Sequence, residues 1–318
     1  MPGFLPRHER IVESRSFLDL RSLPTSLLVL GGGVIGCEFA CLLANLGVQV
    51  TIVELLEDIL WSLDGDVRQQ VRQHMEKILG IRILTGKPLE NITAGNNGVR
   101  GTCGDQKVEA DLLLAALGRR PVTERLNLRK AGLTTNPQGY FEVDEYGRTQ
   151  IPAIYAVGDI TGGPQLAHAA TSQGLVAAEN ACTKKLRKNE TCVPACIFTS
   201  PEVGAVGLSE QEAKQSGREV KTGKFPFRAL GKGLATGQTF GFAKWIADPQ
   251  TDQLLGAQVV GPHATELIAE ATLAIRAELT ASELVHTIHS HPTLSEAWLE
   301  SAHVLLGEPI HTTPPKKK

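Results

Sequence analysis

The stretch from Ser26 to Glu54 is the sequence feature that most constrains the fold. It runs from a short apolar segment through a turn with the spacing G-x-G-x-x-G into an apolar segment of helical spacing, which ends at Gly47. A second apolar run follows and is closed by Glu54. A strand, glycine turn, helix and strand in this order are typical of a parallel βαβ unit. The sequence therefore predicts an α/β fold with a Rossmann-like, doubly wound domain.

The glycine turn has the chemistry of a dinucleotide site. Gly31 permits a tight turn, Gly33 lets a pyrophosphate approach the backbone, and Gly36 lets helix and strand pack closely. The helix N-terminus offers N–H groups to the phosphates, and Glu54 lies where an acid would bind the adenosine ribose. Since no arginine or lysine directly follows Glu54, NAD is favoured over NADP. A glycine turn in another doubly wound sheet is the alternative interpretation.

Length and charge set wider limits. A chain of 318 residues predicts two or three domains, and a net charge of −2 favours neither nucleic acid nor a membrane surface as a partner. No apolar run is long enough to span a membrane, and residues 1–25 lack the apolar region of a signal peptide. We therefore expect a cytoplasmic protein without nucleic-acid or membrane partners.

Six cysteines in a chain of this length do not indicate a disulfide scaffold. Cys37 and Cys41 lie one helical turn apart, which fits either a redox pair or two small apolar residues on one packed face. We favour the packed face. The same structural interpretation is favoured for Cys192 and Cys196.

The pattern of elements changes near residue 191. Before it, strands and helices alternate, with a strand expected at 154–159 and a helix at about 166–181; after it, five strands precede three helices, which is typical of a separate α+β domain. The expected division is a lead-in at 1–24, an NAD-binding domain at 25–147, a central segment that contacts FAD at 148–190, a dimerisation domain at 191–311 and a tail at 312–318.

Three histidines lie close together between the last expected helices, at His286, His289 and His291, and Glu296 follows. A metal site is disfavoured, because no carboxylate or cysteine adds the usual ligand spacing. His291 and Glu296 are spaced to form an acid–base pair, in which the carboxylate fixes the tautomer of the imidazole. A buried histidine in a turn is equally compatible with the spacing.

Several motifs recur in the order found in one family. They are GGGVIGCE at 31–38, ALGRRP at 116–121, YAVGD at 155–159, LAH at 166–168, TSPEV at 199–203 and HPTLSE at 291–296. With these motifs the chain resembles the flavin-linked pyridine nucleotide–disulfide oxidoreductases, and among them those that oxidise dihydrolipoamide. The resemblance extends from about Ser14 to Gly307.

The resemblance implies two cofactors, NAD and FAD. The residues implied for NAD are Gly31, Gly32, Gly33, Val34, Ile35, Gly36, Cys37, Glu38, Glu54, Pro88 and Gly118. Those implied for FAD are Asp159, for the hydroxyls of the flavin side chain, and Gln165, Leu166, Ala167 and His168, along the isoalloxazine.

The resemblance also implies the catalytic pair and its partners. His291 would take a proton from the substrate dithiol, oriented by Glu296, and would serve the active site of the other subunit. A homodimer formed through residues 192–311 follows. The macromolecular partner would be the lipoyl domain of a 2-oxoacid dehydrogenase or glycine cleavage complex.

The chain departs from the family pattern in what it lacks. Residues 1–25 hold no earlier G-x-G-x-x-G, no two cysteines have the family's C-x-x-x-x-C spacing, and Ala169 stands where the family commonly has lysine. We therefore expect either a fragment of a longer chain or one half of a split enzyme whose flavin domain is a separate polypeptide. A non-catalytic, dimeric NAD-binding remnant is the alternative. A relative that reduces glutathione is disfavoured by Glu54, and a mercuric-ion reductase by the absence of a C-terminal cysteine pair.

Overall fold

The computed structural model describes residues 3–183 and 186–312. The chain forms two compact units, one of Met1–Gly118 with Cys196–Lys318 and one of Arg119–Ala195. Within the described residues, the helices are all too short or too polar to cross a membrane.

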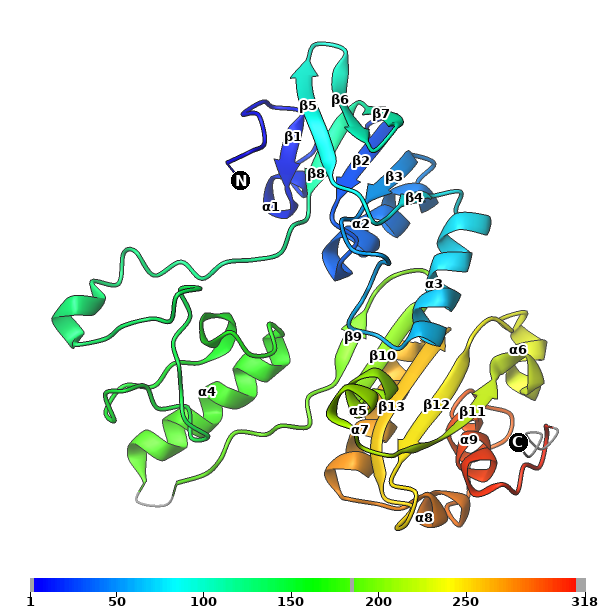
Figure 1. Ribbon diagram of the computed structural model, residues 1–318. Helices are drawn as coiled ribbons and strands as arrows, with labels where there is room; N and C mark the ends of the chain where they lie inside the picture. Colours follow the sequence, from blue (N-terminus) through cyan, green and yellow to red (C-terminus); the bar gives the residue numbers. More distant parts are fainter. Residues whose placement is uncertain (1–2, 184–185, 313–318) are drawn as a thin grey trace. The chain divides into compact units, whose positions relative to one another are not determined.

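The first part of the larger unit contains a five-stranded parallel sheet in the order β1-β8-β2-β3-β4 (Figure 1). Its strands are β1 (Ile11–Glu13), β2 (Ser26–Leu30), β3 (Gln49–Val53), β4 (Arg82–Leu84) and β8 (Leu112–Ala115), and its helices are α1 (Ser14–Phe17), α2 (Val34–Asn45) and α3 (Gly65–Lys77). The predicted βαβ unit is confirmed as β2-α2-β3. The edge strand β1 lies in the expected lead-in and was not predicted, because three residues are too few to show a period.

The two faces of this sheet are covered differently. Cys37 and Ala40 of α2 pack against Val29 and Ile52 on one face. On the other face lies a three-stranded antiparallel sheet, which shares a core with the parallel sheet. This second sheet consists of β5 (Leu89–Gly95), β6 (Gly98–Cys103) and β7 (Gln106–Ala110).

The smaller unit holds the 3₁₀ helices η1 (Leu128–Ala131) and η2 (Gly158–Thr161) and the helix α4 (Ala167–Cys182). It spans Arg119–Ala195. The predicted helix is confirmed, but the predicted strand at 154–159 is wrong. Only one isolated bridge forms there, between Arg148 and Tyr155, and the chain then enters η2. A strand needs a partner for its backbone groups, and the described part of this unit offers it none beyond that bridge.

The second part of the larger unit is a five-stranded antiparallel sheet in the order β11-β12-β13-β10-β9. Its strands are β9 (Ala195–Ile197), β10 (Glu202–Gly207), β11 (Lys221–Pro226), β12 (Phe242–Ala247) and β13 (Leu254–Gly261). The helical elements are α5 (Glu210–Ser216), η3 (Phe227–Ala229), α6 (Gly231–Thr236), α7 (Ala264–Arg276), α8 (Ala281–Val285) and α9 (Glu296–Leu306). The five strands and the last three helices are as predicted, whereas the helices α5 and α6 between the strands are additional.

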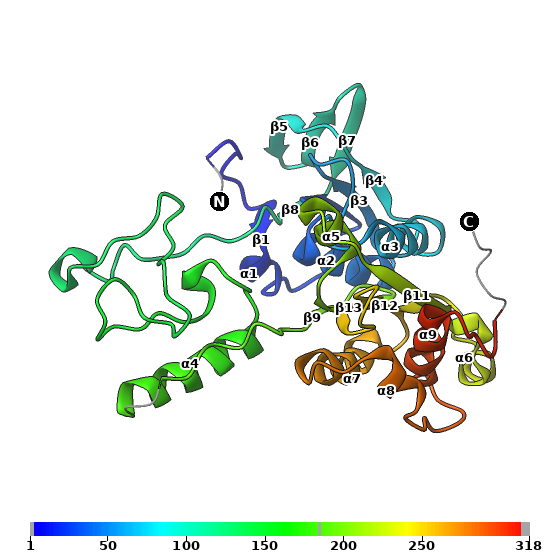
Figure 2. The same cartoon turned by 60° about the horizontal axis from the view of Figure 1, so that its bottom comes forward.

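The helices α7 and α9 lie against this sheet (Figure 2), and two tryptophans hold them there. The rings of Trp245 on β12 and Trp298 on α9 lie 4.7 Å apart, both fully buried. The indole of Trp245 donates to the Trp298 carbonyl at 3.0 Å, and that of Trp298 donates to Leu267 of α7 at 3.0 Å. Because α7, α9 and β12 are fixed to one another, the loop that leads from α8 into α9 has a rigid frame.

Candidate functional site

The glycine turn after β2 has a backbone that only glycine allows. Gly31 has φ +112°, and a Cβ added there would lie 2.5 Å from the Ala116 carbonyl oxygen. A Cβ on Gly36 would lie 2.0 Å from the carbonyl oxygen of Gly31. At both positions the neighbouring backbone lies too close to leave room for a side chain, as the sequence predicted.

Gly33 differs from these two glycines. It is the N-cap of α2, and no described atom lies within 4 Å of a Cβ added there. The first N–H groups of a helix have no partner within it and carry a partial positive charge. The open space at Gly33 thus exposes an anion-binding helix end, and the residues present fit the pyrophosphate of NAD.

Glu54 directly follows β3 and reaches back to the same turn. Its Oε2 accepts the N–H of Gly32 at 2.6 Å, and its Oε1 accepts that of Leu56 at 2.8 Å. A Cβ on Gly32 would lie 2.7 Å from Ile59 Cγ2 and 3.1 Å from Glu54 Cβ. Glu54 and Ile59 can therefore come this close only because residue 32 is a glycine. The G-x-G-x-x-G motif itself does not specify the residue at this position.

The other residues expected at NAD lie in different surroundings. Cys37 is buried, with its thiol 3.3 Å from the Gly32 carbonyl oxygen, and the Glu38 carboxylate accepts the N–H of Phe198 at 2.8 Å. Burial raises the pKa of Glu38. Pro88 is exposed just before β5, and Gly118 has φ +92°. The structure thus brings Gly31 to Gly36 and Glu54 together, and it places Cys37 beneath the turn.

The residues expected at FAD belong to the smaller unit. Asp159 is exposed on η2, and Leu166 and Ala167 are the N-cap and first residue of α4. His168 Nε2 lies 2.7 Å from the Pro194 carbonyl oxygen, so this nitrogen carries a proton, and Gln165 donates to the Tyr140 hydroxyl at 3.3 Å. An exposed carboxylate near an exposed helix start fits the polar side chain of a flavin.

The predicted histidine–glutamate pair forms in the loop between α8 and α9. His291 Nδ1 lies 2.9 Å from Glu296 Oε1, while Oε2 of the same carboxylate accepts the N–H of Thr293 at 2.8 Å. Because a carboxylate accepts, the network assigns the proton to Nδ1 and leaves Nε2 as an acceptor. The His291 side chain is 72% exposed, so the alternative of a buried histidine in a turn is wrong.

The neighbouring histidines have separate partners. His289 Nε2 lies 2.7 Å from Glu270 Oε1 on α7, and His286 Nδ1 lies 2.6 Å from the Ser282 carbonyl oxygen. Sequence reasoning missed Glu270, because it belongs to another element. It also missed Gly231 at the start of α6, where an added Cβ would lie 3.3 Å from Cε1 of His291.

The thiols of α2 do not have the properties of a redox pair. Cys37 and Cys41 are both buried. Burial raises the pKa of Cys37 well above its usual value and that of Cys41 to about 11. Since the thiolate is the reactive form, these cysteines are inert in the fold, which supports the packed-face interpretation.

Comparisons with known proteins agree with this geometry. The family model described as pyridine nucleotide-disulphide oxidoreductase matches residues 1–174, and the dimerisation domain of the same family matches residues 193–302. The chain belongs to the pyridine nucleotide-disulphide oxidoreductase family.

Within this family the chain is similar to dihydrolipoyl dehydrogenases. It is 46% identical over 313 residues to that of Chlamydia pneumoniae, covering 98% of this chain and 68% of the relative. It is 42% identical over 317 residues to that of Halobacterium salinarum, covering 98% and 67%. The expected resemblance is confirmed, and the chain spans about two-thirds of these relatives' length.

Solved structures show the same fold. LpdA from Mycobacterium tuberculosis matches with a TM-score of 0.88 at 31% identity, over 95% of this chain and 66% of that one. The HOCl-induced flavoprotein disulfide reductase RclA from Escherichia coli matches with a TM-score of 0.87 at 29% identity, over 94% and 69%. The expected architecture, a parallel Rossmann-like sheet with a C-terminal dimerisation domain, is confirmed.

Proposed function

We propose that this chain provides the NAD site and the proton-accepting residue of a dihydrolipoyl dehydrogenase. The observation that carries the proposal is the exposed His291, whose Nδ1 donates to Glu296 and whose Nε2 has no hydrogen-bond partner among the described residues. The overall reaction converts dihydrolipoamide and NAD⁺ into lipoamide, NADH and a proton.

His291 acts on the proton of a substrate thiol. A thiol attacks a disulfide as thiolate, so its proton must leave before sulfur–sulfur exchange. The unprotonated Nε2 accepts it, and the Glu296 carboxylate stabilises the imidazolium that forms. Histidine is the side chain commonly used as a general base near neutral pH, which suits this role. In this family a redox disulfide and bound FAD carry the electron pair on to NAD.

The remaining assignments extend the same proposal. The turn from Gly31 to Glu38, with Glu54, Pro88 and Gly118, holds NAD, and Glu54 disfavours the 2′-phosphate of NADP. Asp159 and residues 165–168 contact FAD. The domain limits are those expected from the sequence, and a cytoplasmic homodimer forms through the C-terminal domain. The dimer serves the lipoyl domain of a 2-oxoacid dehydrogenase or glycine cleavage complex.

Reconstitution tests this function. The purified chain is titrated with NADH by fluorescence, and its visible spectrum is recorded with FAD. The oxidation of dihydrolipoamide by NAD⁺ is then assayed with and without the amino-terminal flavin domain of a dihydrolipoyl dehydrogenase relative. We expect activity only with that domain, lowered about 10²-fold or more by His291→Gln and unchanged by His286→Gln. NADH binding without any activity would favour the non-catalytic remnant.

A further inference from the structure

The loop before α9 turns one histidine inward and another outward. The side chain of His289 is only 6% exposed, whereas that of His291 is 72% exposed and Ile288 is 97% exposed. A buried imidazole so near an exposed one needs partners of its own.

Both ring nitrogens of His289 face acceptors. Nδ1 lies 2.8 Å from the Thr287 carbonyl oxygen, which can only accept, so Nδ1 carries a proton. Nε2 lies 2.7 Å from Oε1 of Glu270. The Glu270 side chain is 36% exposed and keeps contact with water, and its Oε1 is the acceptor that faces Nε2. Nε2 therefore also carries a proton, and His289 is an imidazolium in the fold.

The pKa of His289 agrees with this protonation state. The hydrogen bond to Glu270 raises it and outweighs the burial that opposes the charge. The Thr287 carbonyl and the charge of Glu296 act in the same direction as Glu270. The two carboxylates come from different helices, Glu270 from α7 and Glu296 from α9.

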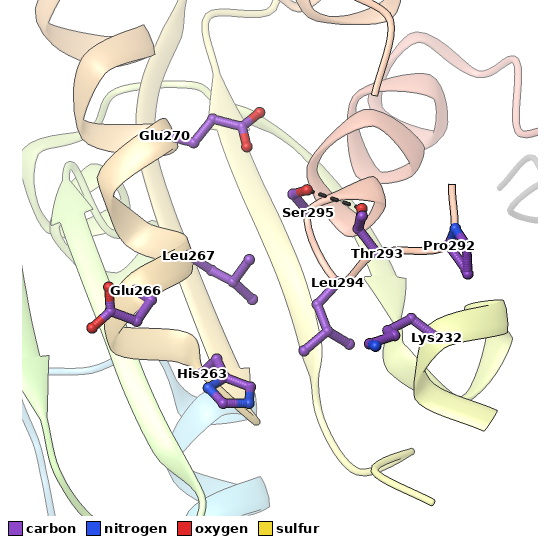
Figure 3. Close-up of a pocket in the computed structure, with 9 residues that line it drawn as sticks. All are labelled: Lys232, His263, Glu266, Leu267, Glu270, Pro292, Thr293, Leu294 and Ser295. Carbon is purple, nitrogen blue, oxygen red and sulfur yellow. Dashed lines mark hydrogen bonds between the residues drawn. The ribbon is translucent and has the colours of Figure 1, made fainter. Parts of the chain in front are cut away.

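The loop is thus held from both sides. Glu270 binds it to α7 through His289, and Glu296 binds it to α9 through His291 and the N–H of Thr293. Figure 3 shows Glu270 on α7 and the segment Thr293–Ser295 on opposite sides of a pocket of about 450 Å³. Since the α7–α9 frame is fixed by Trp298, the contact with α7 limits where the loop can place the ring of His291.

We propose that His289 and Glu270 are positioning residues for His291. Their ion pair holds the loop so that His291 Nδ1 donates to Glu296 and Nε2 remains the proton acceptor. This inference rests on the proposed function, because it concerns the proton-accepting nitrogen of that site.

Nitrogen NMR of the histidine rings tests the inference without requiring activity. Long-range ¹H–¹⁵N spectra of the full chain, labelled at histidine, report which ring nitrogens carry protons. The variants are Glu270→Gln, which keeps the shape and removes the charge, and His289→Gln. The control is Glu266→Gln, one turn earlier on α7 and exposed. His291→Gln assigns the signal, and circular dichroism verifies the fold of each variant.

In the unaltered chain we expect His289 to carry both protons at neutral pH and neutral His291 to carry its proton on Nδ1. Glu270→Gln and His289→Gln should shift His291 to a mixture of its two tautomers, while Glu266→Gln leaves it unchanged. Retention of the single Nδ1–H tautomer in both variants would overturn the inference, as would a singly protonated His289. Absence of enzyme activity with the expected tautomers would instead count against the proposed function alone.

Discussion

Nζ of Lys244 lies 2.8 Å from Oδ2 of Asp64, and both side chains are buried. Lys244 belongs to β12 of the C-terminal part, whereas Asp64 precedes α3 of the N-terminal part. The same ammonium contacts Asp66 at 2.8 Å and Glu210 at 2.7 Å. Oxygens of the three carboxylates come within 4.8 Å of one another, a spacing that suits a metal ion, but the lysine already supplies positive charge there. An ion cluster built around the buried Lys244 and Asp64 therefore joins the two parts of the larger unit.

Replacement of Lys244 by methionine should destabilise this unit strongly. Burial alone would lower the pKa of Lys244, but the charge of Asp66 and the three carboxylate hydrogen bonds raise it, so the residue is charged in the fold. Its removal leaves Asp64 buried without its cation, at a cost of about 3–5 kcal/mol. Urea unfolding at pH 7 measures the loss.

Lys224→Met is the matched control for this variant. Lys224 lies 3.2 Å from Asp66, but its side chain is 49% exposed. A solvated pair of this kind contributes less than about 1 kcal/mol. An equal loss of unfolding free energy in Lys244→Met and Lys224→Met would show that the buried ion pair stabilises the fold no more than the exposed one.

Substitutions at Gly36 and Gly33 should have different effects, the first on folding stability and the second on nucleotide binding. Gly36→Ala places a methyl group 2.0 Å from a backbone oxygen and should cost about 1–3 kcal/mol of stability or more. Gly33→Ala fills open space, so the fold should persist while NADH binds more than about tenfold more weakly, about 1.4 kcal/mol. Thermal unfolding and NADH fluorescence titration measure the two effects. Unchanged NADH affinity in Gly33→Ala would contradict the placement of the pyrophosphate.

Local sequence patterns predicted the features whose parts lie close together along the chain. The β2-α2-β3 unit follows from hydrophobic period and glycine spacing, and the pair of His291 and Glu296 spans only five positions. Lys244 and Asp64 lie 180 positions apart, and His289 and Glu270 lie 19 apart on separate elements. Such pairs depend on how elements pack, which a pattern of residues does not encode.

The errors in the prediction have a similar cause. The run at 154–159 has the composition of a buried strand, yet strand formation depends on a neighbour with which to pair. Conversely, β1 has only three residues, and its pairing with β8 makes it a strand. The role of Gly32 likewise depends on residues distant in the sequence, because Glu54 and Ile59 pack closely against it.

The cysteines of α2 should resist alkylation in the folded chain. With a pKa of about 11, Cys41 is about 0.03% thiolate at pH 7.5, and it is also buried. Cys182 is exposed at the end of α4 and should react first. Iodoacetamide labelling followed by peptide mass spectrometry measures the order, with labelling in urea as the control. If Cys41 in the folded chain were alkylated as fast as Cys182, the packed face of α2 would have to become accessible to solvent.

The ion pair of His289 and Glu270 should make stability depend on pH above about pH 6.5. Histidine in the unfolded chain titrates near about pH 6.5, and the pKa of His289 is raised in the fold. The folded state thus binds the proton more tightly, so the pair stabilises fully below about pH 6.5 and its contribution is lost as pH rises through the raised value. The free energy of unfolding is measured in urea from pH 6 to pH 9. The values for the unaltered chain and for His289→Gln should converge at high pH. The control variant His286→Gln, at an exposed histidine, should show the same pH dependence as the unaltered chain. A constant gap between the unaltered chain and His289→Gln across this range would mean that the proton on His289 does not contribute to folding.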